Sequence, residues 1–196
     1  MVTAMSLAVN NDEVAFRFVS GARALDLLST LGNRHREPVE RLREPPDLDR
    51  WLAAAGFSVG AQSSTRDLRD AHCLREALNR TTRALLANEA PPEVDLAELN
   101  RWARDRPLAP QLEASGAVRW VAGRPVRAAL ASIAREAIAL LSSEERGLIR
   151  ECAAAPSCSL LYLDRSRGRN RRWCEMARCG SRAKMSVYRD RQRSAT

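Results

Sequence analysis

The segment that decides the fold of the C-terminal part reads CAAAPSC at residues 152–158 and CEMARC at residues 174–179. It holds four of the five cysteines of the chain, as two pairs separated by a loop. Paired thiolates in this arrangement are typical of structural zinc sites, which are tetrahedral. A segment of about 45 residues buries too little apolar surface to fold alone, and a bound metal supplies the missing free energy. We therefore expect one structural zinc ion, bound by Cys152, Cys158, Cys174 and Cys179.

Other interpretations of the cysteines are weaker. Four buried thiols without a metal, or a redox pair, would give no reason for the cysteines to cluster in one short segment with few aromatic residues. A catalytic zinc ion needs an open coordination position, and four protein thiolates would leave none. The only histidines, His35 and His72, lie far from the cysteines in the sequence. The pattern therefore favours a structural ion.

The residues between and after the cysteine pairs predict a small β-hairpin followed by a helix. Residues 160–164 are typical of a strand, 165–170 of a polar turn and 171–173 of a returning strand, and a helix is expected over 176–193. This order of elements predicts a zinc-ribbon or treble-clef-like finger. One face of the helix, with Met176 and Val187, is expected to pack on the hairpin.

The same segment carries most of the positive charge. Residues 165–193 contain eleven basic residues against Glu175 and Asp190, a net charge of +9, whereas the whole chain has +8. On the expected helix, Arg178, Arg182, Arg189 and Arg193 share one face as a stripe about 22 Å long. Such a stripe matches nucleic-acid phosphates, and a merely solvated helix face is the alternative. The residues expected to contact nucleic acid are Arg171, Arg172, Arg178, Arg182, Lys184, Arg189 and Arg193.

The rest of the chain has mainly helical periodicity. Residues 1–12 are polar and expected to fray, and 14–19 alternate like a short strand. The remaining expected elements are helices over 25–31, 47–56, 65–86, 95–102 and 125–141 and a hairpin that pairs 111–112 with 118–121. Asp47 and Thr65 are the expected N-caps of the second and third of these helices. The fold class is therefore mainly α with small β elements.

Composition narrows the class of protein. Hydrophobic residues make up 45% of the chain and charged residues 29%, which is typical of a globular protein. No apolar run approaches the roughly 18–20 residues of a membrane span, and residues 1–9 do not resemble a secretory signal. We expect a cytoplasmic protein of two parts: a helical body, residues 1–147, and an arginine-rich zinc finger, residues 148–196.

Two sets of motifs resemble known families. RWCEMARCGSRAK (172–184), with LYLD (161–164) and the first cysteine pair, resembles the CGNR zinc finger, named for its Cys-Gly-Asn-Arg signature. ALDLLSTLGNR (24–34) and DLDRWL (47–52) resemble the ABATE domain that usually precedes that finger. Ser181 stands where the signature has asparagine, and Ser29 also replaces an asparagine. The resemblance implies a stress-associated bacterial transcription regulator whose four clustered cysteines bind zinc and whose finger binds DNA.

We therefore expect a regulator that binds DNA through the finger, with a body that senses a small-molecule effector or dimerises. An adaptor that binds an acidic protein partner and an RNA-binding module are the alternatives, because a row of arginines does not by itself distinguish these partners. An enzyme is the least favoured class: the body has no glycine-rich phosphate loop and no Ser/His/Asp set.

Overall fold

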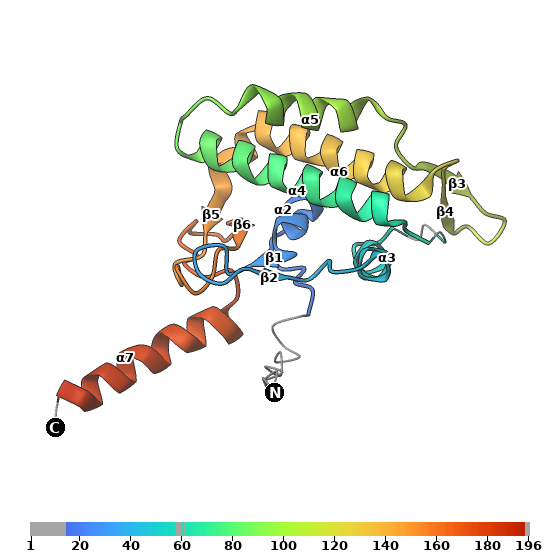
Figure 1. The fold of residues 1–196 in the computed structure, drawn as a ribbon. Coiled ribbons are helices and arrows are strands. Elements are labelled where there is room, and N and C mark those ends of the chain that lie inside the picture. The colour runs from blue at the N-terminus through green and yellow to red at the C-terminus, as the bar shows by residue number, and fades with distance from the viewer. Residues whose placement is uncertain (1–14, 58–59, 61, 195–196) are drawn as a thin grey trace, which may run out of the picture.

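The computed structural model describes residues 15–57, 60 and 62–194, and in these residues the chain is mainly helical with three two-stranded antiparallel sheets (Figure 1). Residues 1–12, which were expected to fray, and Val14, the first residue of the strand expected at 14–19, lie outside the described residues. Residues 15–19 form no strand. The elements are α2 (Arg23–Leu28), β1 (Leu31–Gly32), β2 (Val39–Glu40), α3 (Pro45–Ala54), α4 (Thr65–Leu86), α5 (Glu93–Arg104), β3 (Ala109–Leu112), β4 (Val118–Val121), α6 (Pro125–Ser142), η1 (Glu144–Leu148), β5 (Ile149–Glu151), β6 (Leu161–Leu163), η2 (Met176–Gly180) and α7 (Ser181–Ser194).

The helices of the body begin where their sequences supply caps. Ser64, and not the expected Thr65, caps α4: its hydroxyl accepts a hydrogen bond from the Asp67 amide, and the Asp67 carboxylate accepts one from the Ser64 amide. Helix α3 begins at Pro45, two residues before the expected cap. Asp47 lies inside its first turn, where its carboxylate accepts hydrogen bonds from the amides of Arg43 and Glu44. The expected cap residue thus acts from within the helix.

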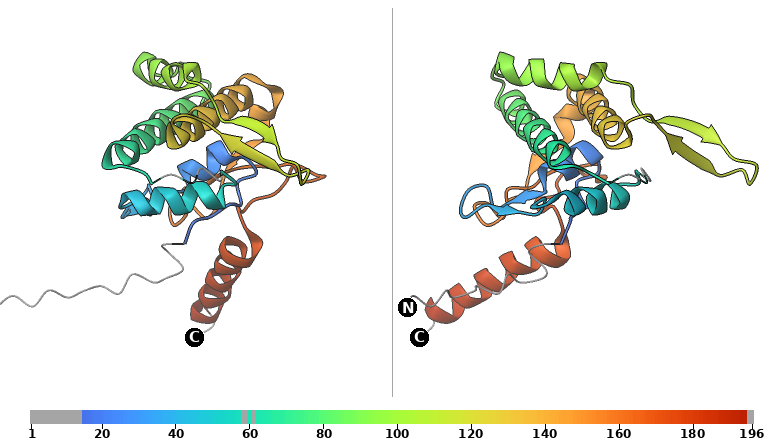
Figure 2. Two further views of the ribbon diagram at one scale, coloured as in Figure 1. Left: turned by 90° about the vertical axis from the view of Figure 1, so that its right-hand side faces the viewer. Right: turned by 45° about the vertical axis from the view of Figure 1, so that its right-hand side comes forward.

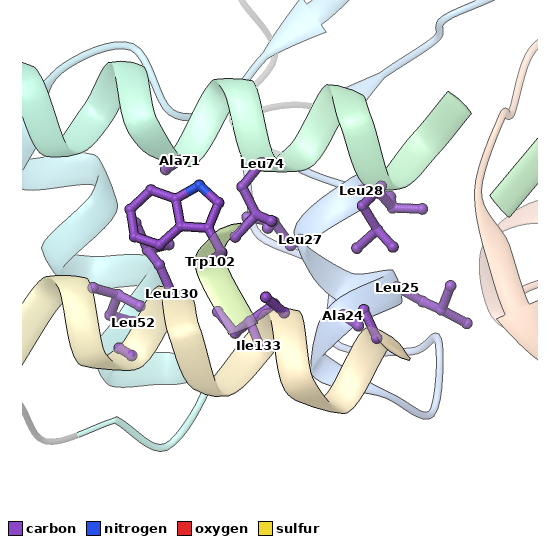
Figure 3. Close-up of a cluster of buried hydrophobic side chains, with 14 of the residues drawn as sticks. Ala24, Leu25, Leu27, Leu28, Leu52, Ala71, Leu74, Trp102, Leu130 and Ile133 are labelled. Atoms are coloured by element: carbon purple, nitrogen blue, oxygen red, sulfur yellow. The ribbon is translucent and has the colours of Figure 1, made fainter. Parts of the chain in front are cut away.

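Helices α4, α5 and α6 pack together, and α2 lies against α4 and α6 (Figure 1). Figure 3 shows the fully buried Trp102 indole between α4 and α6, with Ala71 and Leu74 on one side and Leu130 on the other. The indole N–H donates a hydrogen bond of 2.8 Å to the Glu98 carboxylate. Burial of apolar surface from α2, α4, α5 and α6 in one cluster is the main source of stability of the body.

Strand β6 connects the body to the C-terminal finger. It pairs with β5 in the register Ile149↔Leu163 and Glu151↔Leu161. Because side chains alternate along a strand, Leu161 and Leu163 enter the apolar core of the body, whereas Tyr162 points into a second buried cluster that contains the four cysteines. The finger is therefore fixed to the body through a shared strand, and the boundary expected at residue 147 stays a prediction.

Two elements project from the rest of the molecule. In both views of Figure 2, α7 extends away from the body, and in the right-hand view the β3–β4 hairpin does so too. The hairpin pairs Leu112 with Val118, so the hairpin expected between 111–112 and 118–121 is confirmed, with a first strand that begins at Ala109. The main contacts of α7 are with η2. In the described part of the chain, no helix is long and apolar enough to cross a membrane.

Candidate metal centre

The first cysteine pair lies in the loop that joins β5 to β6. Cys152 directly follows β5, and its amide donates a hydrogen bond of 3.0 Å to the Leu160 carbonyl, which extends the pairing of the two strands. Cys158 lies at the other end of the loop, three residues before β6 begins. Both thiols are buried. The loop of the β5–β6 hairpin therefore supplies the first two sulfur atoms of the site.

The second pair is placed by a tight π-helical turn, η2. Cys174 precedes the turn and Cys179 lies within it, where the amides of Cys179 and Gly180 both donate to the Glu175 carbonyl. A Cβ atom at position 180 would collide with the Met176 sulfur, so a larger residue here would make the exposed Met176 side chain move. The turn directs the Cys179 sulfur back toward Cys174, and α7 follows at once.

The four sulfur atoms converge as a zinc site requires. All four lie within 4.8 Å of one another, and the sulfur atoms of Cys158 and Cys174 are 3.8 Å apart, those of Cys174 and Cys179 3.6 Å. Four thiolates about 2.3 Å from a tetrahedral zinc ion would be about 3.8 Å from one another. The donor set and its spacing fit zinc, so the four cysteines are positioned to bind one zinc ion, which confirms the expected cofactor.

The electrostatics of the cluster also favour a cation. Hydrogen bonds from Cys158, Cys174 and Cys179 to the Cys152 sulfur lower the pKa of Cys152. The pKa of Cys174 is raised by its hydrogen bonds with Cys152, Cys158 and Cys179 and by burial, so a second thiolate is disfavoured beside the first. A bound zinc ion removes this conflict, since it stabilises all four thiolates together.

Side chains from both parts of the molecule surround the sulfur atoms. Arg17, from the body, donates a hydrogen bond of 2.5 Å to the Glu175 carboxylate, and its guanidinium nitrogen lies 3.9 Å from the Cys174 sulfur. Burial lowers the pKa of Arg17, but the negative charges of Cys174 and Glu175 outweigh burial and raise it. Tyr162 is fully buried beside the cysteines, with the guanidinium of Arg171 4.5 Å from the centre of its ring.

The expected return strand at residues 171–173 is wrong, because the partner of β6 is β5. The backbone groups of Arg171 are already used: its amide donates to the Asp164 carboxylate at 3.0 Å, and its carbonyl accepts a hydrogen bond from the Tyr162 hydroxyl. The pKa of Asp164 is lowered because the Ser166 hydroxyl, the Ser166 amide and the Arg171 amide donate to its carboxylate. The strand expected at residues 160–164 is confirmed as β6, but it is the second strand of a hairpin whose loop carries the first cysteine pair.

The basic residues expected at a nucleic-acid interface lie in two environments. Arg171 is part of the finger interior, where its side chain donates to the carbonyls of Trp173 and Cys174. Arg178 lies in η2 and not on α7, so the helix expected over 176–193 begins with a π-helical turn and continues as α7. The residues exposed to solvent are Arg172, Arg182, Lys184, Arg189 and Arg193.

The expected packing of the apolar helix face on the hairpin is also wrong. Met176 is 56% exposed and Val187 51% exposed, because α7 points away from the hairpin and not along it (Figure 1). Ser181, at the signature position, donates a hydrogen bond of 3.3 Å to the Met176 carbonyl. Ser29 donates at 2.7 Å to the Asp26 carbonyl. Both serines thus hold local turns.

Comparison with known families gives two matches. Residues 21–144 match the ABATE family, described as "Putative stress-induced transcription regulator". Residues 149–192 match the CGNR zinc finger, which contains all four clustered cysteines. The two matches follow each other in the order that the sequence motifs predict. No curated protein matches the chain.

Proposed function

Since this chain belongs to the ABATE family and ends in a CGNR zinc finger, we propose that it is a transcription regulator that binds DNA through α7. The observation that carries the proposal is the placement of this helix. It extends away from the body (Figure 2) and directly follows η2, the turn that contains Cys179. Its sequence contains five basic residues and one acidic residue, Asp190.

The dimensions of α7 suit a DNA groove. Fourteen residues make a helix about 21 Å long, and the major groove of B-DNA admits a single α-helix. Arg182, Arg189 and Arg193 recur at intervals that place them on one face, over about 16 Å of the helix. An isolated helix of this length is only marginally stable in water, so binding along its exposed sides would also stabilise it.

Within the interface, we assign the phosphate contacts to Arg172, Lys184, Arg189 and Arg193, which are exposed. Arg182 lies three residues after a zinc ligand, where the metal holds the backbone most firmly, so it is the residue best placed to reach a base edge. Arg171 and Arg178, also expected at the interface, would act mainly by shaping the finger that presents α7.

The test is a titration of the zinc-loaded full chain against a labelled DNA duplex at two salt concentrations. Arg189→Ala should weaken binding to all sequences and reduce the slope of log K against log salt by about one unit. The control is Arg104→Ala, an exposed arginine on α5, which lies on the opposite side of the molecule (Figure 1). Absence of binding at low salt, with zinc bound, would refute the proposal.

One observation favours a second candidate, an adaptor for an acidic protein. Met185, Val187 and Tyr188 are each more than half exposed on α7, and such apolar side chains are more frequent in protein interfaces than on free surfaces. An adaptor would retain partner binding in moderate salt and show no affinity for duplex. Replacing the labelled duplex by single-stranded or double-stranded RNA in the same titration tests the RNA-binding alternative.

A further inference from the structure

The β3–β4 hairpin has one apolar face, and that face is exposed to solvent. The strands pair Pro110 with Trp120 and Leu112 with Val118. Because side chains alternate between the two faces of a strand, these four side chains lie together on one face. Pro110 is exposed, and the exposed fractions of the others are 79% for Leu112, 55% for Val118 and 42% for Trp120. The hairpin thus presents a continuous apolar surface.

The charged side chains of the hairpin lie away from this face. The side chain of Gln111 accepts a hydrogen bond of 3.0 Å from the Arg119 guanidinium on the opposite face. The same guanidinium lies 3.3 Å from the carboxylate of Glu113, at the start of the turn. Glu113 and Arg119 are the only charged residues of 109–121. The hairpin is therefore neutral, and its apolar face carries no charge.

The apolar face is not packed on the body. Strands β3 and β4 pack mainly on each other, and the hairpin projects from the rest of the molecule (Figure 2). An antiparallel sheet with one apolar face normally packs that face on a core. A two-stranded hairpin alone is at best marginally stable in water. A partner that covers the apolar face would therefore also stabilise the hairpin.

The distribution of charge favours a second copy of the chain as that partner. Nucleic-acid phosphates need cations, and this face has none. An uncharged face can contact its own copy without electrostatic repulsion, as a two-fold symmetric interface requires. The hairpin and α7 leave the body on different sides (Figures 1 and 2), so contact between two hairpins keeps the two fingers apart. This separation matters because residues 165–193 carry a net charge of +9 in each copy.

The size of the face also suits a dimer of this chain. The exposed fractions of Leu112, Val118 and Trp120 correspond to roughly 350 Å² of surface per chain. A standard interface buries about 800 Å² on each partner, and about 65% of a homodimer interface is apolar. The face therefore supplies most of the apolar centre of a small interface, which predicts a reversible dimer of modest affinity.

We propose that the chain forms a homodimer in which the apolar faces of two β3–β4 hairpins pack on each other about a two-fold axis. The two small sheets then lie about 10 Å apart, and each covers the apolar face of the other. The α7 helices remain outside the contact, so the dimer presents two separate fingers. This inference does not depend on what α7 binds.

The test is sedimentation velocity of the zinc-loaded full chain, without DNA, over a range of protein concentrations. The mass should rise from the 21.8 kDa of one chain to twice that value, with a dissociation constant of about 1–100 μM. Leu112→Glu should abolish dimerisation, because symmetry places two buried carboxylates at one interface. The matched control is Gln111→Glu, which puts the same side chain on the opposite face of the same strand and should dimerise like the wild type.

A third variant keeps the hairpin intact while it changes the apolar face. Val118→Thr retains the β-branched shape that strands favour, and it should weaken the dimer roughly tenfold because two hydroxyl groups enter the interface. All three substituted positions are exposed and lie outside the core of the body, so the body should fold as in the wild type.

Three outcomes would overturn the proposal. The first is a wild-type chain that stays monomeric at all concentrations, including one that instead co-sediments with anionic phospholipid vesicles. The second is equal dimerisation of Leu112→Glu and Gln111→Glu, which would place the contact elsewhere. The third is a mass that grows beyond the dimer, because a two-fold contact is closed. Failure of duplex binding would refute the function proposed above and leave these results unchanged.

Discussion

Replacing neighbouring residues of β6 is expected to damage different parts of the molecule. Leu161 is 2% exposed in the core of the body, whereas Tyr162 is fully buried in the cysteine cluster. Truncation of a buried leucine to alanine costs about 3 kcal/mol. In a protein of this size, 1 kcal/mol lowers the melting temperature by roughly 2–4 °C. Leu161→Ala should therefore lower the melting temperature of the helical signal by about 9 °C and leave zinc affinity nearly unchanged.

Tyr162→Ala should act mainly on the metal site. It removes the ring that packs against the cysteines and under Arg171, at a cost of about 4 kcal/mol by analogy with buried aromatic residues. Because zinc binding and folding of the finger are linked, zinc affinity should fall by about a thousandfold. Tyr162→Phe is the control: it loses only the hydroxyl hydrogen bond to the Arg171 carbonyl, at about 1 kcal/mol.

Two measurements separate the variants. Thermal unfolding followed by circular dichroism reports on the helical body, and competition with a chromogenic chelator reports on zinc affinity. If Leu161→Ala weakens zinc binding as much as Tyr162→Ala while its melting temperature stays at the wild-type value, the division of β6 into two faces is refuted.

Three further predictions follow from the same structure. Metal analysis of the wild-type chain should find one zinc ion, and Cys174→Ser should abolish tight binding; a wild-type chain purified without chelator that lacks zinc would contradict the site. Truncation after Ser143 should lower the melting temperature of the body, because its core then loses Ile149, Leu161 and Leu163 at a cost of about 2 kcal/mol each. A truncated body with the melting temperature of the full chain would show that β5 and β6 do not stabilise the body. Burial raises the pKa of Glu76, but hydrogen bonds from Arg34 and Arg75 outweigh burial and lower it. The ion pairs of Glu76 therefore stabilise the fold at pH values above the pKa of the unfolded chain, and this stabilisation is lost as the pH falls through the pKa of the folded state. Glu76→Gln should therefore cost roughly 1–2 kcal/mol in urea unfolding at pH 7 and make stability less sensitive to pH below about pH 5; an unchanged pH dependence would contradict this role.

The sequence alone determined the parts of this protein that depend on local patterns. The four cysteines predict a zinc site because each chelating pair is close together in the chain. In the structure their four sulfur atoms converge. The long helices over 65–86 and 125–142 follow from apolar residues that recur with the helical period, so their existence needs no knowledge of distant contacts. These local motifs were also sufficient to indicate the two families that match the chain.

Only the tertiary structure decided what joins the two parts. The partner of β6 could not be chosen from strand-like sequence, because residues 171–173 also look like a strand and only the folded chain shows that β5 pairs with β6 and that Asp164 and Tyr162 bind the Arg171 backbone. Arg17 reaches the zinc site from 157 residues away, and no local pattern links it to Cys174. The exposure of the apolar hairpin face was decided in the same way, because alternation along a strand shows which side chains share a face and not whether a distant element covers it.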